Sequence, residues 1–170
     1  MPKIKKIVSG GQTGVDRATL DVAIEMGIPH GGCCPKGRRA EDGPIDSLYQ
    51  LKETPREDYI QRTEWNVRDS DGTLILCFGA PTGGTAFTVE CARRTKKPIL
   101  IIDMKSDPPD KNIFVNWIDK NRIQILNVAG PRESTAPTVY PRARQVLSEI
   151  IRNPSVTKGR GFGFFMGSFG

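Results

Sequence analysis

Two short glycine-containing turns hold most of the residues in this chain that could do chemistry. The first lies in residues 7–17, IVSGGQTGVDR, and the second is Thr82-Gly83-Gly84-Thr85. In both places an apolar stretch typical of a strand is followed by a helical pattern. Glycine adopts backbone conformations that other residues avoid, and the first N–H groups of a helix lack partners within it. Turns of this kind bind anions, phosphate above all.

Two such turns that face one ligand are a stronger signal than one. Neither turn is a P-loop, since no Gly-Lys-Ser/Thr follows at the required spacing, and the first does not have the GxGxxG spacing of dinucleotide-binding proteins. The sequence therefore gives no support to kinase-like ATP hydrolysis or to nicotinamide chemistry. We expect phosphate binding by backbone N–H groups and threonine hydroxyls, with tight turns that bind no ligand as the alternative. The expected ligand-binding residues of the two turns are Gly10, Gly11, Gln12, Thr13, Gly14, Asp16, Thr82, Gly83, Gly84 and Thr85.

Asp16 lies in the first turn of the helix that follows the first glycines. A carboxylate there is favoured by the helix dipole, so a purely capping role is one interpretation. Because a carboxylate repels phosphate, a functional Asp16 should instead contact a ligand hydroxyl, an amine or a bridging cation.

A basic loop follows the second predicted strand. Lys36, Arg38 and Arg39 could close over the anion, the two arginines through bidentate contacts. The alternative is a solvated cluster of charges, partly balanced by Glu41 and Asp42 beside it. We expect Lys36, Arg38 and Arg39 to be ligand-binding residues.

Four helical residues could border the same site. Arg62, Trp65 and Asn66 share one face of a predicted helix, and the ring of Trp65 could stack on a flat heterocycle or simply pack against the protein. Glu90 lies about one and a half turns into the helix after Thr85. It could reach a ribose-like hydroxyl, act as an acid, or form a surface ion pair.

The spacing of the cysteines and the single histidine give no support to metal binding or to histidine-dependent nucleophilic catalysis. Cys33, Cys34, Cys77 and Cys91 form no CxxC pair and no His-spaced set, so we expect no protein-bound metal. His30 is the only histidine, which leaves no basis for a Ser-His-Asp or Cys-His mechanism unless His30 itself serves.

Composition indicates a globular protein with one core. The chain has 170 residues, 37% apolar and 26% charged, with no apolar run long enough to span a membrane and no leader pattern, so we expect a cytoplasmic protein. The net charge of +6 invites a nucleic-acid interpretation, but the basic residues are scattered and do not alternate with aromatics. A solvated surface with one anion site is favoured over nucleic acid.

Strand and helix patterns alternate along the chain. This alternation predicts a single α/β domain over residues 1–153, a Rossmann-like open, mainly parallel sheet with helices on both faces. We expect the strands 3–9 and 73–78 to be neighbours where the strand order reverses, with the ligand beyond their carboxyl ends. The predicted strands are 3–9, 28–32, 51–54, 73–78, 98–103 and 123–128, and the predicted helices are 15–26, one opening at Pro55, 83–95, 111–121 and 138–152. The buried face of the helix that opens at Pro55 is expected to be Tyr59, Ile60, Thr63 and Val67.

Residues 154–170 form a tail rich in glycine and phenylalanine, without helical or strand periodicity. We expect either a flexible end or a segment that docks on a neighbouring subunit.

Three stretches resemble one known family. SGGQTGVDRAxLDxAxxxGIPHGGxCPKGRRAEDGPI, RTxWNVxDSDGTLI and PTGGTxxTVExAxRxxKP, which together span most of residues 7–102, resemble the molybdenum carrier family. That family belongs to a Rossmann-like superfamily with the lonely-guy phosphoribohydrolases and the DNA-processing protein A. The resemblance implies binding and protection of the molybdenum cofactor (molybdopterin), a homo-oligomer such as a dimer or tetramer, and molybdoenzymes as acceptors.

The enzyme relatives carry a PGGxGTxxE signature from which this chain departs. Thr82 replaces the first glycine, and Glu90 stands at a different spacing from the signature glutamate. The leading hypothesis is therefore a non-enzymatic carrier of a phosphorylated heterocycle. The alternative is a nucleoside-monophosphate N-glycosidase with Glu90 or Asp16 as acid or base and Arg62 orienting the phosphate. Single-stranded DNA binding is a third class, which lacks stacking platforms here.

Overall fold

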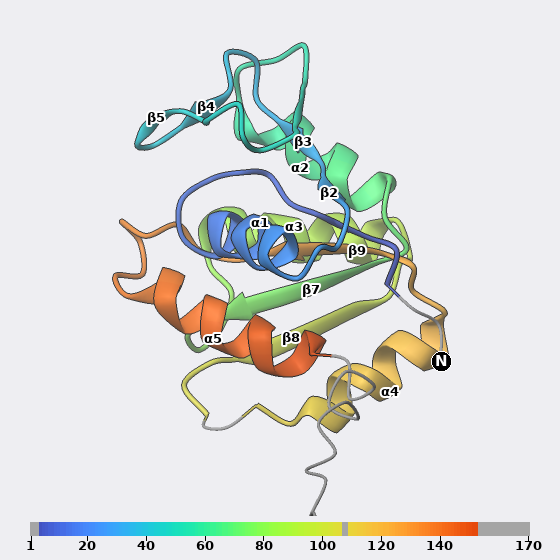
Figure 1. Ribbon diagram of the computed structural model, residues 1–170. Coiled ribbons are helices and arrows are strands. Elements are labelled where there is room, and N and C mark those ends of the chain that lie inside the picture. Colours follow the sequence, from blue (N-terminus) through green and yellow to red (C-terminus); the bar gives the residue numbers. More distant parts are fainter. Residues whose placement is uncertain (1–3, 107–108, 153–170) are drawn as a thin grey trace, which may run out of the picture.

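A computed structural model describes residues 4–106 and 109–152. The tail predicted over residues 154–170 lies outside the described residues. The five strands of the central sheet pair in the order β2 (His30–Gly31), β1 (Lys6–Val8), β9 (Ile125–Ala129), β7 (Gly72–Cys77) and β8 (Ile99–Asp103). All four pairings are parallel (Figure 1).

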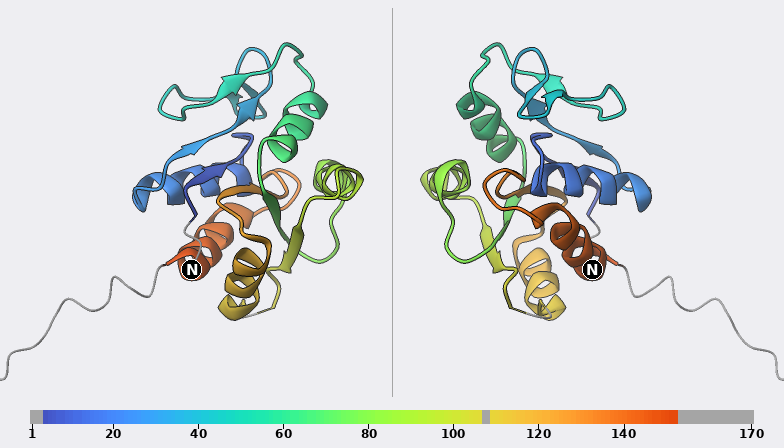
Figure 2. Two further views of the ribbon diagram at one scale, coloured as in Figure 1. Left: turned by 90° about the vertical axis from the view of Figure 1, so that its right-hand side faces the viewer. Right: turned by 90° about the vertical axis from the view of Figure 1, so that its left-hand side faces the viewer.

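Helices cover both faces of this sheet (Figures 1 and 2). On one face α1 (Val15–Glu25), α4 (Lys111–Asn121) and α5 (Val139–Ile151) pack over Leu74 and Leu76 of β7. On the other, α3 (Gly83–Arg94) packs over Ile75 and Cys77, and α2 (Tyr59–Arg68) packs against α3 through Val67. Because side chains alternate across a strand, the fully buried β7 supplies both cores. The predicted α/β fold class is confirmed.

A small projection extends from this sheet between β2 and α2, at the top of Figure 1. It contains the parallel pair β3 (Cys33–Cys34) and β6 (Lys52–Glu53) and the antiparallel pair β4 (Arg39–Ala40) and β5 (Gly43–Pro44). Arg38 organises it, because its guanidinium donates to four backbone carbonyls. These belong to Ile45, Asp46, Tyr49 and Leu51. The stretch predicted as a loop is thus held by one arginine.

The prediction that the strands 3–9 and 73–78 pair as neighbours was wrong. β9 lies between β1 and β7 and pairs with both in parallel. Strand order depends on long-range packing, and the apolar strand nearest the carboxyl terminus completes the centre of the sheet. The loop that follows β9 therefore enters the space between the two glycine turns.

The predicted buried face of the second helix was also wrong in part. α2 begins after Asp58, whose carboxylate accepts from the N–H groups of Ile60 and Gln61. Its buried residues are Arg62, Asn66 and Val67, whereas Ile60 is 49% exposed. Apolar periodicity misled here because this helix turns a polar face inward, toward the carboxyl ends of the strands.

Candidate functional site

A cavity of about 590 Å³ lies beyond the carboxyl ends of β1, β9 and β7. It is formed by the two glycine turns, the polar face of α2 and the loop after β9. Several backbone groups line it together with a ring of polar side chains. The lining residues include Gly10, Gln12, Asp16, Tyr59, Arg62, Asn66, Thr82, Gly83, Gly84, Thr85 and Arg132.

The second glycine turn presents an open helix N-terminus to this cavity. Thr82 is the N-cap of α3 and makes no side-chain capping bond. Among the described residues, no acceptor is found for the N–H groups of Gly83 and Gly84, while those of Thr85 and Ala86 donate to the Thr82 carbonyl. A Cβ atom built at Gly83 or Gly84 would meet no protein atom within 4 Å. Both glycines line the cavity, so these N–H groups are available to an anion bound there.

The first glycine turn is closed by protein instead. A Cβ at Gly14 would lie 2.4 Å from the carbonyl oxygen of Pro131, and this oxygen accepts from the N–H of Val15 at 3.2 Å. The hydroxyl of Thr13 accepts from the N–H of Glu133 at 3.1 Å. The N-terminus of α1 is thus capped by the loop after β9, and the two turns are not equivalent.

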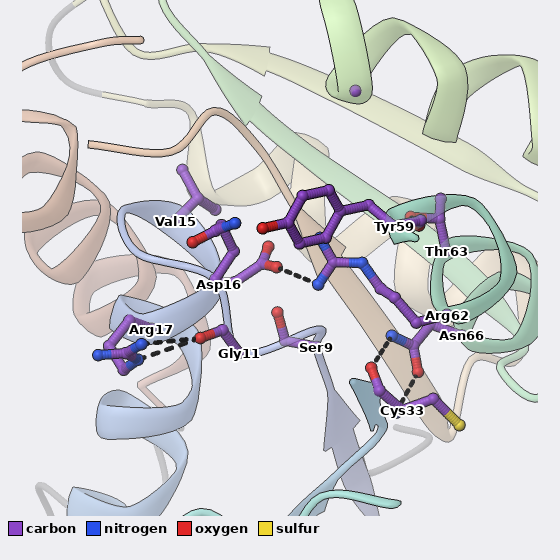
Figure 3. A network of polar contacts seen from close by, with 12 residues as sticks. Ser9, Gly11, Val15, Asp16, Arg17, Cys33, Tyr59, Arg62, Thr63 and Asn66 are labelled. Carbon is purple, nitrogen blue, oxygen red and sulfur yellow. Dashed lines mark hydrogen bonds and ion pairs between the residues drawn. The ribbon is translucent and has the colours of Figure 1, made fainter. Parts of the chain in front are cut away.

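The guanidinium of Arg62 lies directly over the backbone of Gly10. A Cβ at Gly10 would lie 1.8 Å from an Nη atom of Arg62 and 2.9 Å from a carboxylate oxygen of Asp16. These two side chains form a buried ion pair of 3.4 Å (Figure 3). A side chain at position 10 would therefore displace the guanidinium of Arg62.

Asp16 is a buried carboxyl at the wall of the cavity. Burial raises its pKa, and the neighbouring Arg62 and the N–H of Gln12 only partly oppose this by favouring the charged form. Such a group can accept hydrogen bonds when charged and donate a proton when neutral. Perturbed carboxyls of this kind in a cavity are candidates for function.

Three guanidinium groups surround the ring of Tyr59. The guanidinium carbons of Arg39, Arg62 and Arg132 lie 5.3, 5.3 and 5.1 Å from the ring centroid. Arg132 also lies 4.0 Å from a carboxylate oxygen of Glu41. Arg62 and Arg132 line the cavity, whereas Arg39, a predicted ligand-binding residue, is exposed and lies outside the lining. The side of the cavity at Tyr59 thus carries two guanidinium groups, which favours an anionic ligand.

Gln12 presents an oriented amide. Its Oε1 accepts from the backbone N–H groups of Thr13 at 3.0 Å and Glu41 at 2.9 Å. Its Nε2 is buried and has no hydrogen-bond partner in the described part of the chain. A buried donor without an acceptor is costly, so a ligand acceptor is the natural partner for it.

A sequence profile described as the circularly permutated YpsA SLOG family matches residues 7–151. The chain belongs to this family. A solved structure of similar fold is that of the putative molybdenum carrier protein from Syntrophus aciditrophicus, determined at 1.45 Å resolution. The two are 47% identical, the match covers 88% of this chain and 96% of the other, and the TM-score is 0.83. The resemblance to molybdenum carriers is thereby confirmed. No curated protein matches this chain.

In this member of the circularly permutated YpsA SLOG family, not every predicted binding residue borders the cavity. Lys36 and Glu90 are exposed and lie outside the lining, and the guanidinium of Arg38 is engaged within the projection. Gly11 faces the apolar side chains of Ile45 and Leu51 rather than the cavity.

Trp65 and Asn66, which were expected on one helix face, have separate roles. Trp65 is not part of the lining and lies under the guanidinium of Arg68, 4.7 Å from its ring centroid. Asn66 borders the cavity, but its side-chain amide is bonded to the backbone of Cys33. It donates to the Cys33 carbonyl at 3.0 Å and accepts from the Cys33 N–H at 2.7 Å.

Arg132 and Tyr59 are two lining residues that were not predicted from the sequence. Arg132 follows Gly130-Pro131 directly after an apolar strand, the same punctuation that marked the two glycine turns. That signal could have identified a third loop at the site. Tyr59 was assigned to the buried face of its helix because of its helical spacing with Ile60, Thr63 and Val67.

The described residues contain no group of three or more His, Cys, Asp or Glu side chains that could hold a metal ion. All four cysteines are buried and free, and burial raises the pKa of each thiol. Within the described part of this family member, no helix has the length and apolar character that a membrane crossing needs.

Proposed function

We propose that this chain binds a phosphorylated heterocycle in the cavity at the carboxyl ends of β1, β9 and β7, with the molybdenum cofactor as the cargo. It would protect the cofactor and deliver it to molybdoenzymes, acting in the cytoplasm as a homo-oligomer. The observation that carries the proposal is the open N-terminus of α3, where the N–H groups of Gly83 and Gly84 face empty space. Phosphate is the group that such a terminus binds best.

The glycine at position 84 supports this assignment. Inside a helix, glycine costs about 1 kcal/mol relative to alanine. Gly84 has an ordinary helical backbone, and no protein atom would contact a Cβ there. Nothing in the described protein therefore calls for glycine at this position, whereas a ligand that approaches the backbone closely would call for it.

The cavity also fits the rest of the cofactor. Its volume of about 590 Å³ lies within the roughly 300–1,000 Å³ that small-molecule sites occupy. The positive side at Arg62 and Arg132 suits an anionic cargo. Since no metal-ligating cluster exists among the described residues, the protein would hold the organic part, and the dithiolene of the cofactor would supply the sulfur ligands of the metal. The name of the Syntrophus aciditrophicus protein points to the same class of cargo.

The proposal is tested by loading the protein with cofactor and measuring reconstitution of a cofactor-free nitrate reductase. Gly84→Ala places a methyl group where the phosphate would lie, and Arg132→Gln removes one positive charge. We expect each variant to transfer at least tenfold less cofactor. Arg93→Gln, at the exposed far end of α3, is the charge-matched control and should transfer normally. Equal transfer by wild type, Gly84→Ala and Arg132→Gln would refute this site.

A second function is favoured by one observation, the buried carboxyl of Asp16 beside Arg62. In a nucleoside-monophosphate N-glycosidase, the C–N bond breaks as the leaving base takes the proton of the carboxyl, water forms the new C–O bond at the anomeric carbon, and the water returns one proton to the carboxylate. Asp16 can supply that proton, whereas Glu90 is exposed and does not line the cavity. Free base released from nucleoside monophosphates by wild type but not by Asp16→Asn would establish this activity. No release by wild type would exclude it for those substrates.

A further inference from the structure

The floor of the cavity near β1 offers one hydrogen-bond donor of fixed orientation. Gln12 is 4% exposed, and its Oε1 is fully used by two backbone N–H groups. An amide held in this way cannot flip, because a flip would place Nε2 against two donors. Gln12 borders the cavity, and its Nε2 is buried without an acceptor among the described residues, so the position of the donor is set before any ligand arrives.

The same cavity holds an acceptor. Asp16 is 6% exposed, borders the same cavity and interacts with the backbone N–H of Gln12. Arg62 engages one of its carboxylate oxygens at 3.4 Å, near the long end for a hydrogen bond. The hydroxyl of Ser9 also lies near Asp16, but it donates its single proton to the carbonyl of Val128 at 2.9 Å. Of the roughly four lone-pair sites of the carboxylate, two therefore remain for further donors. The floor therefore pairs one N–H donor with an acceptor of two N–H groups.

Few ligand edges match such a pair. A 2-amino-4-oxopyrimidine ring, present in guanine and in pterins alike, carries a carbonyl acceptor, a ring N–H and an exocyclic amino group in a row. Adenine has the amino group and ring acceptor in place of the carbonyl and ring N–H, and xanthine has a carbonyl in place of the 2-amino group. Only the first pattern gives Gln12 an acceptor and Asp16 two donors.

We propose that Gln12 and Asp16 select the head group of the ligand by reading a 2-amino-4-oxopyrimidine edge, with Gln12 Nε2 donating to the carbonyl and Asp16 accepting from the ring N–H and the amino group. This inference rests on the proposed function, because it takes the phosphate to lie at the N-terminus of α3. Two N–H donors from a ligand would also stabilise the charged carboxylate that burial disfavours in the free protein.

The two ends of the proposed ligand meet different loops of one cavity. Gln12 follows β1 and Gly84 follows β7, and β9 separates the two strands. Both residues line the same cavity of about 590 Å³, so one ligand can contact both.

The test is equilibrium binding of four purine nucleoside monophosphates, GMP, IMP, AMP and XMP, and of 6-hydroxymethylpterin monophosphate to the full chain. All five share the phosphate, so differences between them report the head group. We expect GMP to bind at least tenfold more tightly than AMP and XMP, with IMP between them, since a good bidentate pair gives about this discrimination. Stronger binding of the pterin phosphate than of GMP would identify a pterin as the source of the edge, and the reverse would identify guanine.

Two variants separate recognition from a structural role. Gln12→Glu keeps an oxygen for the N–H groups of Thr13 and Glu41 but replaces the Nε2 donor, so GMP affinity should fall at least tenfold. Asp16→Asn presents one acceptor and one donor, which matches the ring N–H and 2-oxo group of xanthine. The preference for GMP over XMP should therefore reverse. Gln145→Glu, an exposed residue on α5 outside the cavity, is the matched control and should behave as wild type.

The outcomes are distinct. Equal affinity of wild type for all four nucleotides, with all of them lost in Gly84→Ala, would overturn the head-group assignment while leaving the phosphate site in place. Preference for GMP that survives unchanged in both Gln12→Glu and Asp16→Asn would also overturn it. Reversal toward XMP in Asp16→Asn would establish it, because a misfolded variant loses binding to every nucleotide and gains none.

Discussion

Glycines at two positions of the cavity wall are present for different physical reasons. At Gly10 the protein itself excludes a side chain, because the guanidinium of Arg62 occupies the position that a Cβ would take. At Gly84 the protein leaves that position empty. The fold itself accounts for the glycine at position 10, whereas the glycine at position 84 is accounted for by the proposed ligand.

Gly10→Ala should reduce both stability and binding. The new Cβ would lie 1.8 Å from an Nη atom of Arg62, so the guanidinium must leave Asp16 and the two buried charges lose contact. We expect a loss of about 1–3 kcal/mol in the free energy of unfolding, measured by urea denaturation, as for other overpacked sites. Gly84→Ala is the control, with stability unchanged or raised by up to about 1 kcal/mol. Unaltered stability of Gly10→Ala would mean that Arg62 moves freely.

Between elements, side-chain bonds to the backbone hold the cavity walls in place. Asn66 joins α2 to β3 through two bonds with the backbone of Cys33. Glu41 joins the projection to the first glycine turn and to the loop after β9, because it accepts from Thr13 and from the N–H and hydroxyl of Ser134. These contacts hold the elements that carry Tyr59 and Arg132, whose side chains meet at one cavity.

Asn66→Ala should loosen the attachment of α2. The change leaves the N–H and carbonyl of Cys33, in a buried position, without their side-chain partners. We expect the free energy of unfolding to fall by about 1–3 kcal/mol in urea denaturation. Asn116→Ala, an exposed position on α4, should change it by less than about 0.5 kcal/mol. A similar effect at both positions would contradict this role of Asn66.

The contribution of Glu41 to stability should depend on pH. Burial acts to raise the pKa of Glu41, but the hydrogen bonds from Ser134 and Thr13 outweigh it and hold the pKa below its ordinary 4.5. A lowered folded-state pKa contributes stability above the ordinary value, and this stability is lost as the pH falls through the folded-state pKa.

Comparison of wild type with Glu41→Gln measures this contribution. At pH 7 we expect wild type to be more stable, by at most about 1 kcal/mol because the site is partly solvent-screened. The difference should shrink as the pH falls below 4.5. A difference in unfolding free energy that stays constant from pH 7 to pH 3 would show that the charge of Glu41 is not responsible.

At the scale of the whole molecule, the central position of β9 determines the site. Because β9 lies between β1 and β7, three loops rather than two meet over the carboxyl edge of the sheet. Gly130 directly follows β9, at a point where β7 and α1 come close to its backbone. A Cβ there would lie 2.2 Å from the carbonyl oxygen of Leu76 and 2.5 Å from a methyl group of Val15. β9, β7 and α1 are packed against one another at this point.

Gly130→Ala should therefore disturb the packing of three elements at once. Since the nearest atom is a backbone oxygen that cannot rotate away, we expect a loss of about 3 kcal/mol, at the upper end for overpacking. Thermal unfolding followed by circular dichroism measures it, with Gly84→Ala as the glycine-to-alanine control. A melting temperature equal to that of the control would show that the strand end shifts without cost.

The described fold was largely predictable from the sequence, and the site was predictable in part. The glycine turns, Asp16 and the acidic and basic residues of the projection stand out by residue type and spacing. Arg62 was expected to orient a phosphate, and it lines the cavity. Lys36, Arg38 and Glu90 were expected at the ligand by the same reasoning, and the structure places none of them in the lining. Charge alone does not reveal whether an arginine faces a cavity or, as Arg38 does, the carbonyls of its own loop.

The sequence by itself determined the types of the main elements and the class of the fold, because hydrophobic period and glycine conformation act over a few neighbouring residues. Only the tertiary structure decided the strand order, the closure of the first glycine turn by Pro131 and the place of Arg132 beside Tyr59. The contact between Thr13 and Glu133 joins residues 120 positions apart. Contacts over such separations arise from the packing of the whole chain, which local residue patterns do not encode.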